Sequence, residues 1–214
     1  MSFLYRIILA GNPGSGKSSI GDALIDLTGG RRLSFAAGVK EEVARVILAT
    51  SDDVRMTDRS GQRLIEYKHV EALVARMNDP ETKDQYRAML QNWGTDVRRA
   101  QDPQYWIKQW AKTFNRIREH TNIVVDDARF PNEEEALRSN GFYFVRLADG
   151  PTTRPMDPAA AVHESESYWP TWDYDLELSY EAGPDFQARR ILSAILDRQL
   201  DLLHGTTVIV EPKA

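Results

Sequence analysis

The sequence predicts an α/β fold with a parallel sheet, and two segments carry this prediction. Residues 3–28 read as an apolar β-prone run, a glycine-rich turn and an amphipathic helix. Residues 122–147 read as two strands with a short helix between them, which is a βαβ unit. Strands connected in this way lie parallel in one sheet, with helices packed on both faces. We therefore expect a three-layer αβα arrangement.

The turn after the first strand reads Gly11-Asn12-Pro13-Gly14-Ser15-Gly16-Lys17-Ser18, which fits the pattern G-x-x-x-x-G-K-[ST]. A strand before it and a helix from about residue 20 make it a P-loop, whose backbone N–H groups cradle phosphates. A glycine turn that binds nothing is the alternative, and both flanks argue against it. We expect Lys17 to reach the β- and γ-phosphates and Ser18 to ligate Mg²⁺. The predicted ATP-binding residues are Gly11, Asn12, Pro13, Gly14, Ser15, Gly16, Lys17, Ser18 and Ser19.

The stretch from about 34 to 118 is predicted to be mainly helical, as a subdomain inserted over the nucleotide site. Three apolar sets recur there at helical spacing. They are Val70, Leu73, Val74 and Met77; then Tyr86, Met89, Leu90 and Trp93; then Trp106, Ile107, Trp110, Ala111 and Phe114, after a cap at Asp102-Pro103. We expect the five tryptophans in the core, with Trp106 the best candidate for stacking on a base.

A polar stripe accompanies the second of these sets. At about 100° per residue, four polar residues fall within an arc of about 80°, although Gly94 can interrupt the helix. Two guanidiniums suit a monophosphate, since arginine grips phosphate with two hydrogen bonds. A solvated helix face is the equally weighted alternative. The stripe consists of Arg87, Gln91, Thr95 and Arg98.

The second predicted strand, 122–126, is apolar without alternation, as expected for a strand buried on both faces. It ends in Asp126-Asp127-Ala128-Arg129. A carboxylate at the carboxyl end of such a strand is where Mg²⁺ is held beside a P-loop, and Arg129 is placed to reach a phosphate. A pair of solvated acids is the alternative. The spacing alone leaves Asp126 and Asp127 both open, because neighbouring strand residues point to opposite faces.

The remaining elements follow from local signals. We expect a helix capped by Asn132, a helix end at Gly141 and a third strand at 142–147. Residues 149–162 read as a loop whose Arg154 closes over the transferring group. Residues 173–180 alternate as a half-exposed strand, and 207–210 are expected to add an edge strand. We expect a final helix at 185–203, whose buried face consists of Ile191, Leu192, Ile195, Leu196 and Leu203.

Composition narrows the class of protein. The 214 residues carry a formal net charge of −5, contain no cysteine and are 42% hydrophobic. A negative charge argues against binding a nucleic acid polymer, and the lack of cysteine excludes disulfides and thiolate metal sites. The four scattered histidines suggest no metal centre. We find no signal peptide or membrane-spanning run and expect a cytoplasmic enzyme that acts on small molecules.

Several blocks, in order, give the chain a family resemblance. After the P-loop come Leu33-Ser34-Phe35-Ala36-Ala37-Gly38-Val39-Lys40 and Leu90-Gln91-Asn92-Trp93-Gly94-Thr95-Asp96-Val97-Arg98, then Trp106. They are followed by Asp127-Ala128-Arg129-Phe130-Pro131-Asn132-Glu133 and His163-Glu164-Ser165-Glu166. With these blocks the chain resembles the phage-type deoxynucleoside monophosphate kinases. The resemblance implies a single P-loop kinase domain, with a core at about 1–33, 119–148 and 169–214, a helical substrate-binding region at about 34–118 and a lid at about 149–168.

The resemblance also implies ATP as donor, Mg²⁺ as cofactor and a deoxynucleoside 5′-monophosphate as acceptor, with dNDP and ADP as products for DNA precursor synthesis. It places Lys40, Arg87, Gln91 and Arg98 on the acceptor side. It places Asp127 and Arg129 facing the phosphates. Together with the P-loop and the loop at 149–162, we expect Lys17, Asp127, Arg129 and Arg154 to be catalytic, and Ser18 and Asp127 to bind the metal. The compartment is the host cytoplasm if the protein is phage-encoded, and a homodimer is left open. The chain departs from the family at Leu178-Ser179, where an Asn is usual.

Two other functions compete with this one. Phosphomevalonate kinases share a similar layout and would change only the acceptor. A nucleotide-gated regulatory protein would need a water-orienting residue and a switch loop, and the sequence assigns neither.

Overall fold

The computed structural model describes residues 3–50, 67–79, 81–148, 167–179 and 181–204. The chain divides into two compact units. The sheet unit comprises residues 1–33 and 117–214, and the helical unit comprises residues 34–116.

Within its described residues, the sheet unit contains five parallel strands in the order β2-β3-β1-β4-β5. This confirms the predicted parallel α/β fold. Ile7 of the central strand lies beside Val124 on one side and Tyr143 on the other. The sequence missed the two-residue strand β2, because two arginines give no apolar pattern. The strands are β1 (Arg6–Gly11), β2 (Arg31–Arg32), β3 (Ile123–Val125), β4 (Tyr143–Leu147) and β5 (Leu176–Leu178).

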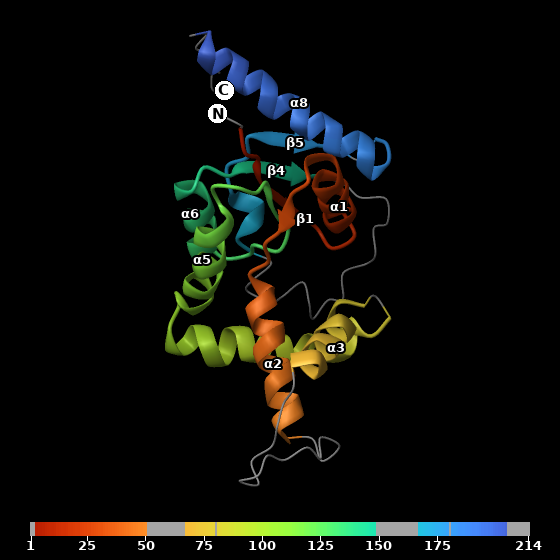
Figure 1. The fold of residues 1–214 in the computed structure, drawn as a ribbon, viewed down its shortest axis with the longest axis vertical. Coiled ribbons are helices and arrows are strands. Elements are labelled where there is room, and N and C mark those ends of the chain that lie inside the picture. Colours follow the sequence, from red (N-terminus) through yellow and green to blue (C-terminus); the bar gives the residue numbers. More distant parts are fainter. Residues whose placement is uncertain (1–2, 51–66, 80, 149–166, 180, 205–214) are drawn as a thin grey trace. The chain divides into compact units, whose positions relative to one another are not determined.

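Helices α1 (Lys17–Thr28) and α8 (Pro184–Leu203) pack on each other over one face of this sheet (Figure 1). Because strand side chains alternate between faces, Ile7 and Leu9 of β1 join Leu24 of α1 and Ile191 of α8 in one buried cluster. This apolar layer fixes the start of α1, and with it the loop that precedes the helix.

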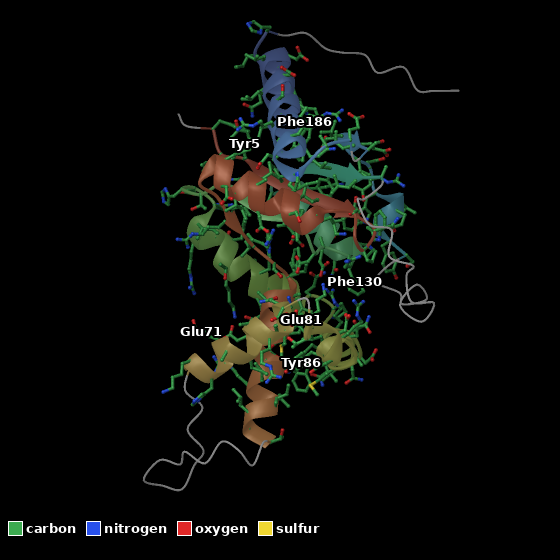
Figure 2. All side chains as sticks on the ribbon, turned by 90° about the vertical axis from the view of Figure 1, so that its right-hand side faces the viewer. Tyr5, Glu71, Glu81, Tyr86, Phe130 and Phe186 are labelled. Carbon is green, nitrogen blue, oxygen red and sulfur yellow. The ribbon has the colours of Figure 1, made fainter. Side chains whose placement is uncertain are left out.

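The end of α8 differs from the prediction. Ile191 and Ile195 are buried, but Leu196 is 45% exposed and Leu203 is 81% exposed. A helix of 20 residues is about 30 Å long, whereas strands of three to six residues span only about 10–20 Å. The sheet can therefore cover only part of the helix. At its other end Phe186 is also exposed (Figure 2).

Helix α6 (Pro131–Ser139) links β3 to β4, as predicted, but it begins differently. Phe130 is the N-cap and Pro131 is the first helical residue, so the predicted cap at Asn132 is wrong. Proline suits this position because its fixed φ is already helical and its missing N–H needs no partner. The predicted helix end is confirmed, since Gly141 has a φ of 70° after the last turn.

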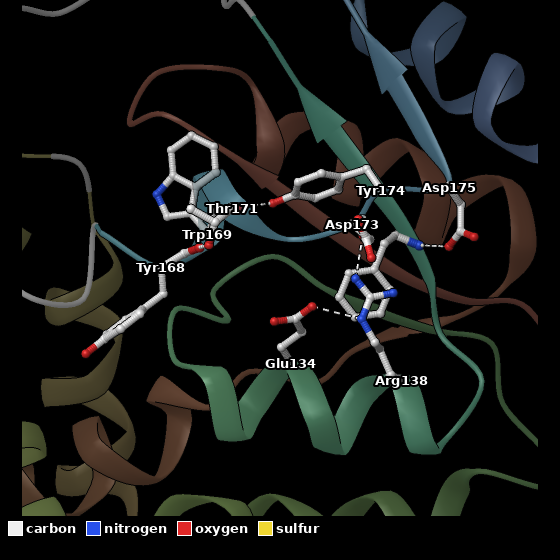
Figure 3. A network of polar contacts seen from close by, with 9 residues as sticks. Glu134, Arg138, Tyr168, Trp169, Thr171, Asp173, Tyr174 and Asp175 are labelled. Atoms are coloured by element: carbon white, nitrogen blue, oxygen red, sulfur yellow. Dashed lines mark hydrogen bonds and ion pairs between the residues drawn. The ribbon is translucent and has the colours of Figure 1, made fainter. Parts of the chain in front are cut away.

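A polar network joins α6 to the segment before β5 (Figure 3). Arg138 donates from Nε to Glu134 at 2.8 Å and from its terminal nitrogen to the Asp173 carbonyl at 2.5 Å. Its guanidinium lies 4.0 Å from the centre of the Phe144 ring. Asp175 accepts the Phe144 backbone N–H at 2.8 Å. These contacts set where β5 begins, and that strand is shorter than the predicted 173–180.

The described residues of the helical unit lie almost entirely in helices, as predicted. Val43 and Ala44 of one helix pack with Val70 and Met77 of another, which confirms the predicted apolar face at 70–77. In the second predicted set, Met89 is 48% exposed and so does not join the core. The elements of the helical unit are α2 (Ala36–Thr50), α3 (Tyr67–Asn78), the 3₁₀ turn η1 (Lys83–Tyr86), α4 (Arg87–Gln91), the π-helix η2 (Asn92–Arg99) and α5 (Tyr105–Ile117).

The error at Met89 has a geometric cause. The chain passes from a 3₁₀ turn through one turn of α-helix into a π-helix between residues 83 and 99. These forms have different numbers of residues per turn, so one angle per residue does not hold across the stretch. The helix also runs on through the buried Gly94 instead of breaking there.

Tryptophans form much of the core, as predicted. Trp110 stacks between Phe35 and Phe114, with ring centres 5.0 and 4.7 Å away. Trp106 is only 2% exposed and donates from Nε1 to the Gly94 carbonyl at 2.9 Å. Its ring also lies against Gly38, where an added Cβ would be 3.1 Å from the ring. Three residues of the family blocks therefore form one packing contact.

Candidate functional site

The glycine-rich loop runs from the carboxyl end of β1 to the first turn of α1. A Cβ at Gly11 would lie 2.7 Å from the Leu147 carbonyl oxygen and 2.8 Å from Ser15 Oγ, so no side chain fits there. Gly16, the residue before the helix, has a φ of 88°, which favours glycine. The loop therefore needs these two glycines to bring its N–H groups to the helix N-terminus, where an anion is favoured.

Lys17 lies back over this loop. Its Nζ donates to the Gly11 carbonyl at 2.7 Å and to the Asn12 carbonyl at 2.8 Å, and Ser15 Oγ lies 3.5 Å away. The ammonium group is therefore held at the mouth of the loop by acceptors that belong to the loop itself.

Asp126, at the end of β3, is a carboxylate that lies near the glycine-rich loop. Its side chain is 8% exposed and pairs with Arg32, and the nearby Ser18 hydroxyl favours its charged form. Burial raises the pKa of Asp126 and the neighbouring Asp127 adds to this rise, while Arg32, Ser18 and Lys17 oppose it. The sequence left the two aspartates open and the resemblance selected Asp127. The observed contacts favour Asp126.

Arg32, on β2, holds this carboxylate and was missed in the sequence. Its Nε lies 3.2 Å from Asp126 Oδ2, and its terminal nitrogens reach Asp22 at 3.1 Å and the Ser18 carbonyl at 2.8 Å. A Cβ at Gly21 would lie 2.6 Å from one of these nitrogens, so a larger residue there would displace the end of the Arg32 side chain. No motif signals Arg32, because its role depends on β2 lying beside β3.

Glu133 supports the other end of the Asp127–Arg129 block. It is 2% exposed, and its Oε2 accepts the backbone N–H groups of Arg129 at 2.7 Å and Phe130 at 3.1 Å. This carboxylate fixes the backbone between β3 and α6, with Phe130 at the start of the helix (Figure 2). The sequence identified Glu133 only as an acid of the first turn.

In the helical unit a single carboxylate collects three donors. Glu42 Oε2 accepts from Trp93 Nε1 at 2.9 Å and from Arg98 Nε at 2.8 Å, and Oε1 accepts from the Tyr105 hydroxyl. The Arg98 guanidinium carbon lies 5.2 Å from the Trp93 ring centre and 4.9 Å from the Tyr105 ring centre. Arg98 is therefore held in place in a cluster that the sequence did not anticipate.

The other polar residues predicted for the acceptor side lie outside this cluster. Lys40 donates to Asn78 Oδ1 at 2.7 Å, and Arg87 pairs with Asp84 at 3.2 Å. Gln91 and Thr95 are half-buried. Among the described residues, none of these four forms a hydrogen bond or ion pair with Arg98. Arg154 and the block His163–Glu166 lie outside the described residues, as do most of the predicted lid and the predicted edge strand at 207–210.

Among the described residues, no group of three or more His, Cys, Asp or Glu side chains is placed to hold a metal ion. Mg²⁺ at phosphate sites needs fewer protein ligands, because it binds through one or two protein oxygens and the phosphates themselves. The Ser18 hydroxyl and the Asp126 carboxylate, which lie near each other, would supply two such hard oxygens. No helix in the described part of the chain is long and apolar enough to cross a bilayer.

The match to a protein family lies beyond the glycine-rich loop. A family model described as deoxynucleotide monophosphate kinase matches residues 46–157, which is more than half of the chain. No curated protein matches the sequence. Among solved structures, an unliganded sugar kinase from Janibacter sp. HTCC2649 is 14% identical, with 90% of this chain and 94% of that chain covered and a TM-score of 0.44. On the family match, the chain belongs to the deoxynucleotide monophosphate kinases and is a phosphotransferase.

Proposed function

We propose that this kinase transfers the γ-phosphoryl group of ATP to a deoxynucleoside 5′-monophosphate, giving a dNDP and ADP. One observation carries the proposal. In a member of this family, a P-loop lysine and a serine–aspartate pair occupy the same end of a parallel sheet. These are the groups that phosphoryl transfer from a nucleoside triphosphate requires.

On the donor side, the loop from Gly11 to Ser19 binds the ATP phosphates through its backbone N–H groups. Lys17 exchanges the Gly11 and Asn12 carbonyls for the β- and γ-phosphate oxygens. Ser18 and Asp126 would hold Mg²⁺, which supplies positive charge against the phosphates when bound. We assign Asp126 this role in place of Asp127 because Asp126 is held by Arg32 and lies near Ser18 and Lys17.

On the acceptor side, Arg98 binds the monophosphate, since a guanidinium offers two parallel donors to phosphate oxygens. Lys40, Arg87, Gln91 and Thr95 contribute to the same region in this proposal. Trp106 supports it indirectly, through the hydrogen bond to the Gly94 carbonyl within η2.

The reaction needs no general base, because a phosphate monoester is already anionic at neutral pH. The attacking phosphate oxygen and the γ-phosphorus repel each other, so catalysis consists of alignment and charge neutralisation. Lys17 and Arg129 supply positive charge, and Arg154 is proposed to add to it.

The test is the release of ADP, measured with a panel of ribo- and deoxynucleoside monophosphates and with phosphomevalonate. We expect turnover with at least one deoxynucleotide and none with phosphomevalonate. ATP hydrolysis that no monophosphate accelerates would contradict the proposal.

Lys17→Ala should lower kcat by a factor of at least about 10³, because it removes a charge from the transferring group. The fold should persist, since the lysine donates to the Gly11 and Asn12 carbonyls and to Ser15 Oγ of its own loop. Circular dichroism checks the fold. Lys68→Ala, on α3 of the helical unit, serves as the control and should retain kcat.

A further inference from the structure

We propose that Glu42 is a positioning residue of the acceptor site, which holds the Arg98 guanidinium by its Nε so that the two terminal nitrogens meet the acceptor phosphate. The inference rests on the proposed function, because it assigns Arg98 to the acceptor. Nothing in the family match bears on Glu42, which lies before the matched residues 46–157.

The hydrogen-bond pattern is the first argument. Arg98 donates a hydrogen bond from Nε to Glu42 at 2.8 Å, and its terminal nitrogens bond to none of the residues that the structure describes. The arginine side chain is 31% exposed, so ligand can reach it. A guanidinium fixed through Nε presents the fork of its two terminal nitrogens in one orientation, which matches two oxygens of a phosphate.

The helix geometry is the second argument. Trp93 and Arg98 are five residues apart in η2, and both donate to the same Glu42 oxygen. In an α-helix residues five apart point in different directions, since the turn has 3.6 residues. The i→i+5 hydrogen bonding of a π-helix instead aligns them. The π-helix is therefore what lets one carboxylate hold both side chains.

The aromatic rings are the third argument. Trp93 and Tyr105 flank the guanidinium at 5.2 and 4.9 Å, within the range of a cation–π contact. Each ring is itself tied to Glu42 by its N–H or O–H group. A long flexible side chain is thus restricted before the ligand arrives, which lowers the entropy lost on binding.

The charge of Glu42 suits this role. Burial raises the pKa of Glu42, but hydrogen bonds from Tyr105, Trp93 and Arg98 together outweigh it and leave the pKa lowered. The group is therefore an anionic acceptor at neutral pH. Two of its three donors, Trp93 and Tyr105, are neutral, so the negative charge of Glu42 does not serve only to neutralise the charge of Arg98.

Glu42→Gln tests the inference in the full-length enzyme, with Glu41→Gln as the matched control. Glu41 is on the same helix, and its carboxylate pairs with Arg45 where both side chains are about half exposed. We expect Glu42→Gln to raise KM for the deoxynucleotide about tenfold, with kcat and KM for ATP changed less than about twofold. Glu41→Gln should leave all three constants unchanged.

A double variant separates positioning from a general structural role. If Glu42 acts through Arg98, adding Glu42→Gln to Arg98→Ala should raise KM for the deoxynucleotide no further. Multiplicative effects of the two substitutions would overturn the inference, as would equal KM values for Glu42→Gln and Glu41→Gln.

Tyr105→Phe provides a second route if Glu42→Gln does not fold. It removes one donor to Glu42 and keeps the ring, and KM for the deoxynucleotide should rise about two- to threefold. An unchanged KM would count against the cluster. A wild-type enzyme that phosphorylates no deoxynucleotide would instead refute the proposed function itself, so the two failures are distinguishable.

Discussion

At the scale of single residues, the two adjacent aspartates after β3 illustrate how position decides chemistry. Asp126 pairs with Arg32 and lies near Ser18, and the charge of the neighbouring Asp127 raises its pKa. Neighbouring residues at a strand end point to opposite sides, so one step along the chain changes the partner. The sequence motif located the two aspartates but did not show which of them has this role.

This difference leads to a testable prediction. Asp126→Asn should lower kcat by a factor of at least about a hundred and raise the Mg²⁺ concentration needed for half-maximal rate, because an amide binds the cation more weakly. Asp127→Asn should lower kcat by less than about tenfold. Steady-state rates at several Mg²⁺ concentrations check both. The reverse order would return the metal-binding role to Asp127.

At the scale of elements, the succession of helix types between residues 83 and 99 determines what the acceptor side presents. The predicted stripe assumed one angle per residue, but the observed path changes from 3₁₀ to α to π. Arg98 consequently pairs with Glu42, while Arg87 pairs with its neighbour Asp84. Sequence periodicity cannot reveal a π-helix, because its register depends on tertiary contacts.

Gly38 and Gly94, which both lie close to Trp106, should respond differently to replacement by alanine. At Gly38 the new Cβ would lie 3.1 and 3.3 Å from ring atoms of Trp106, and a rigid ring in a packed core cannot move away cheaply. We expect Gly38→Ala to lower the free energy of unfolding by about 1–3 kcal/mol.

At Gly94 the nearest atoms to such a Cβ, in Val39, are 3.4 and 3.6 Å away, which is ordinary contact. Replacing a helical glycine removes an entropic cost of about 1 kcal/mol. Gly94→Ala should therefore be neutral or slightly stabilising. Urea unfolding measures both variants, and equal losses would show that the contact at Trp106 is not what matters.

Helix α8 offers a second contrast within one element. Ile191→Ala should lower the free energy of unfolding by about 2–5 kcal/mol, because the side chain is fully buried in the apolar cluster between α8 and the sheet. Leu203→Ala should change it by less than about 0.5 kcal/mol, since that side chain is 81% exposed. Thermal or urea unfolding compares them. A large loss at Leu203 would mean that its exposed surface is covered in solution.

At the scale of the whole molecule, the proposed donor residues belong to the sheet unit and the proposed acceptor residues to the helical unit. Each ligand should therefore leave its own footprint in hydrogen exchange. A non-hydrolysable ATP analogue with Mg²⁺ should slow exchange in residues 11–19, and a deoxynucleotide alone should slow it in residues 92–105. Protection of 92–105 by the ATP analogue alone, with none from the deoxynucleotide, would contradict the assignment of the acceptor side.

The sequence by itself determined the class of fold and the phosphate loop. Both depend on contiguous residues: a strand, glycines at fixed spacing and a helix start in 3–28, and a βαβ unit in 122–147. The backbone conformations that such a loop requires are written locally, because Gly11 and Gly16 tolerate no side chain or favour a positive φ. The parallel direction of β1, β3 and β4 followed from the same local pattern, whereas the pairing of β1 with both other strands did not.

Only the tertiary structure decided which charged groups meet. Arg32 reaches Asp126 because β2 pairs with β3 across some ninety residues of chain, and Glu42 reaches Arg98 because a π-helix turns it toward α2. The extent of the buried face of α8 likewise depended on how far the sheet extends beneath it. Such contacts join residues that are distant in the chain, and no local preference encodes them.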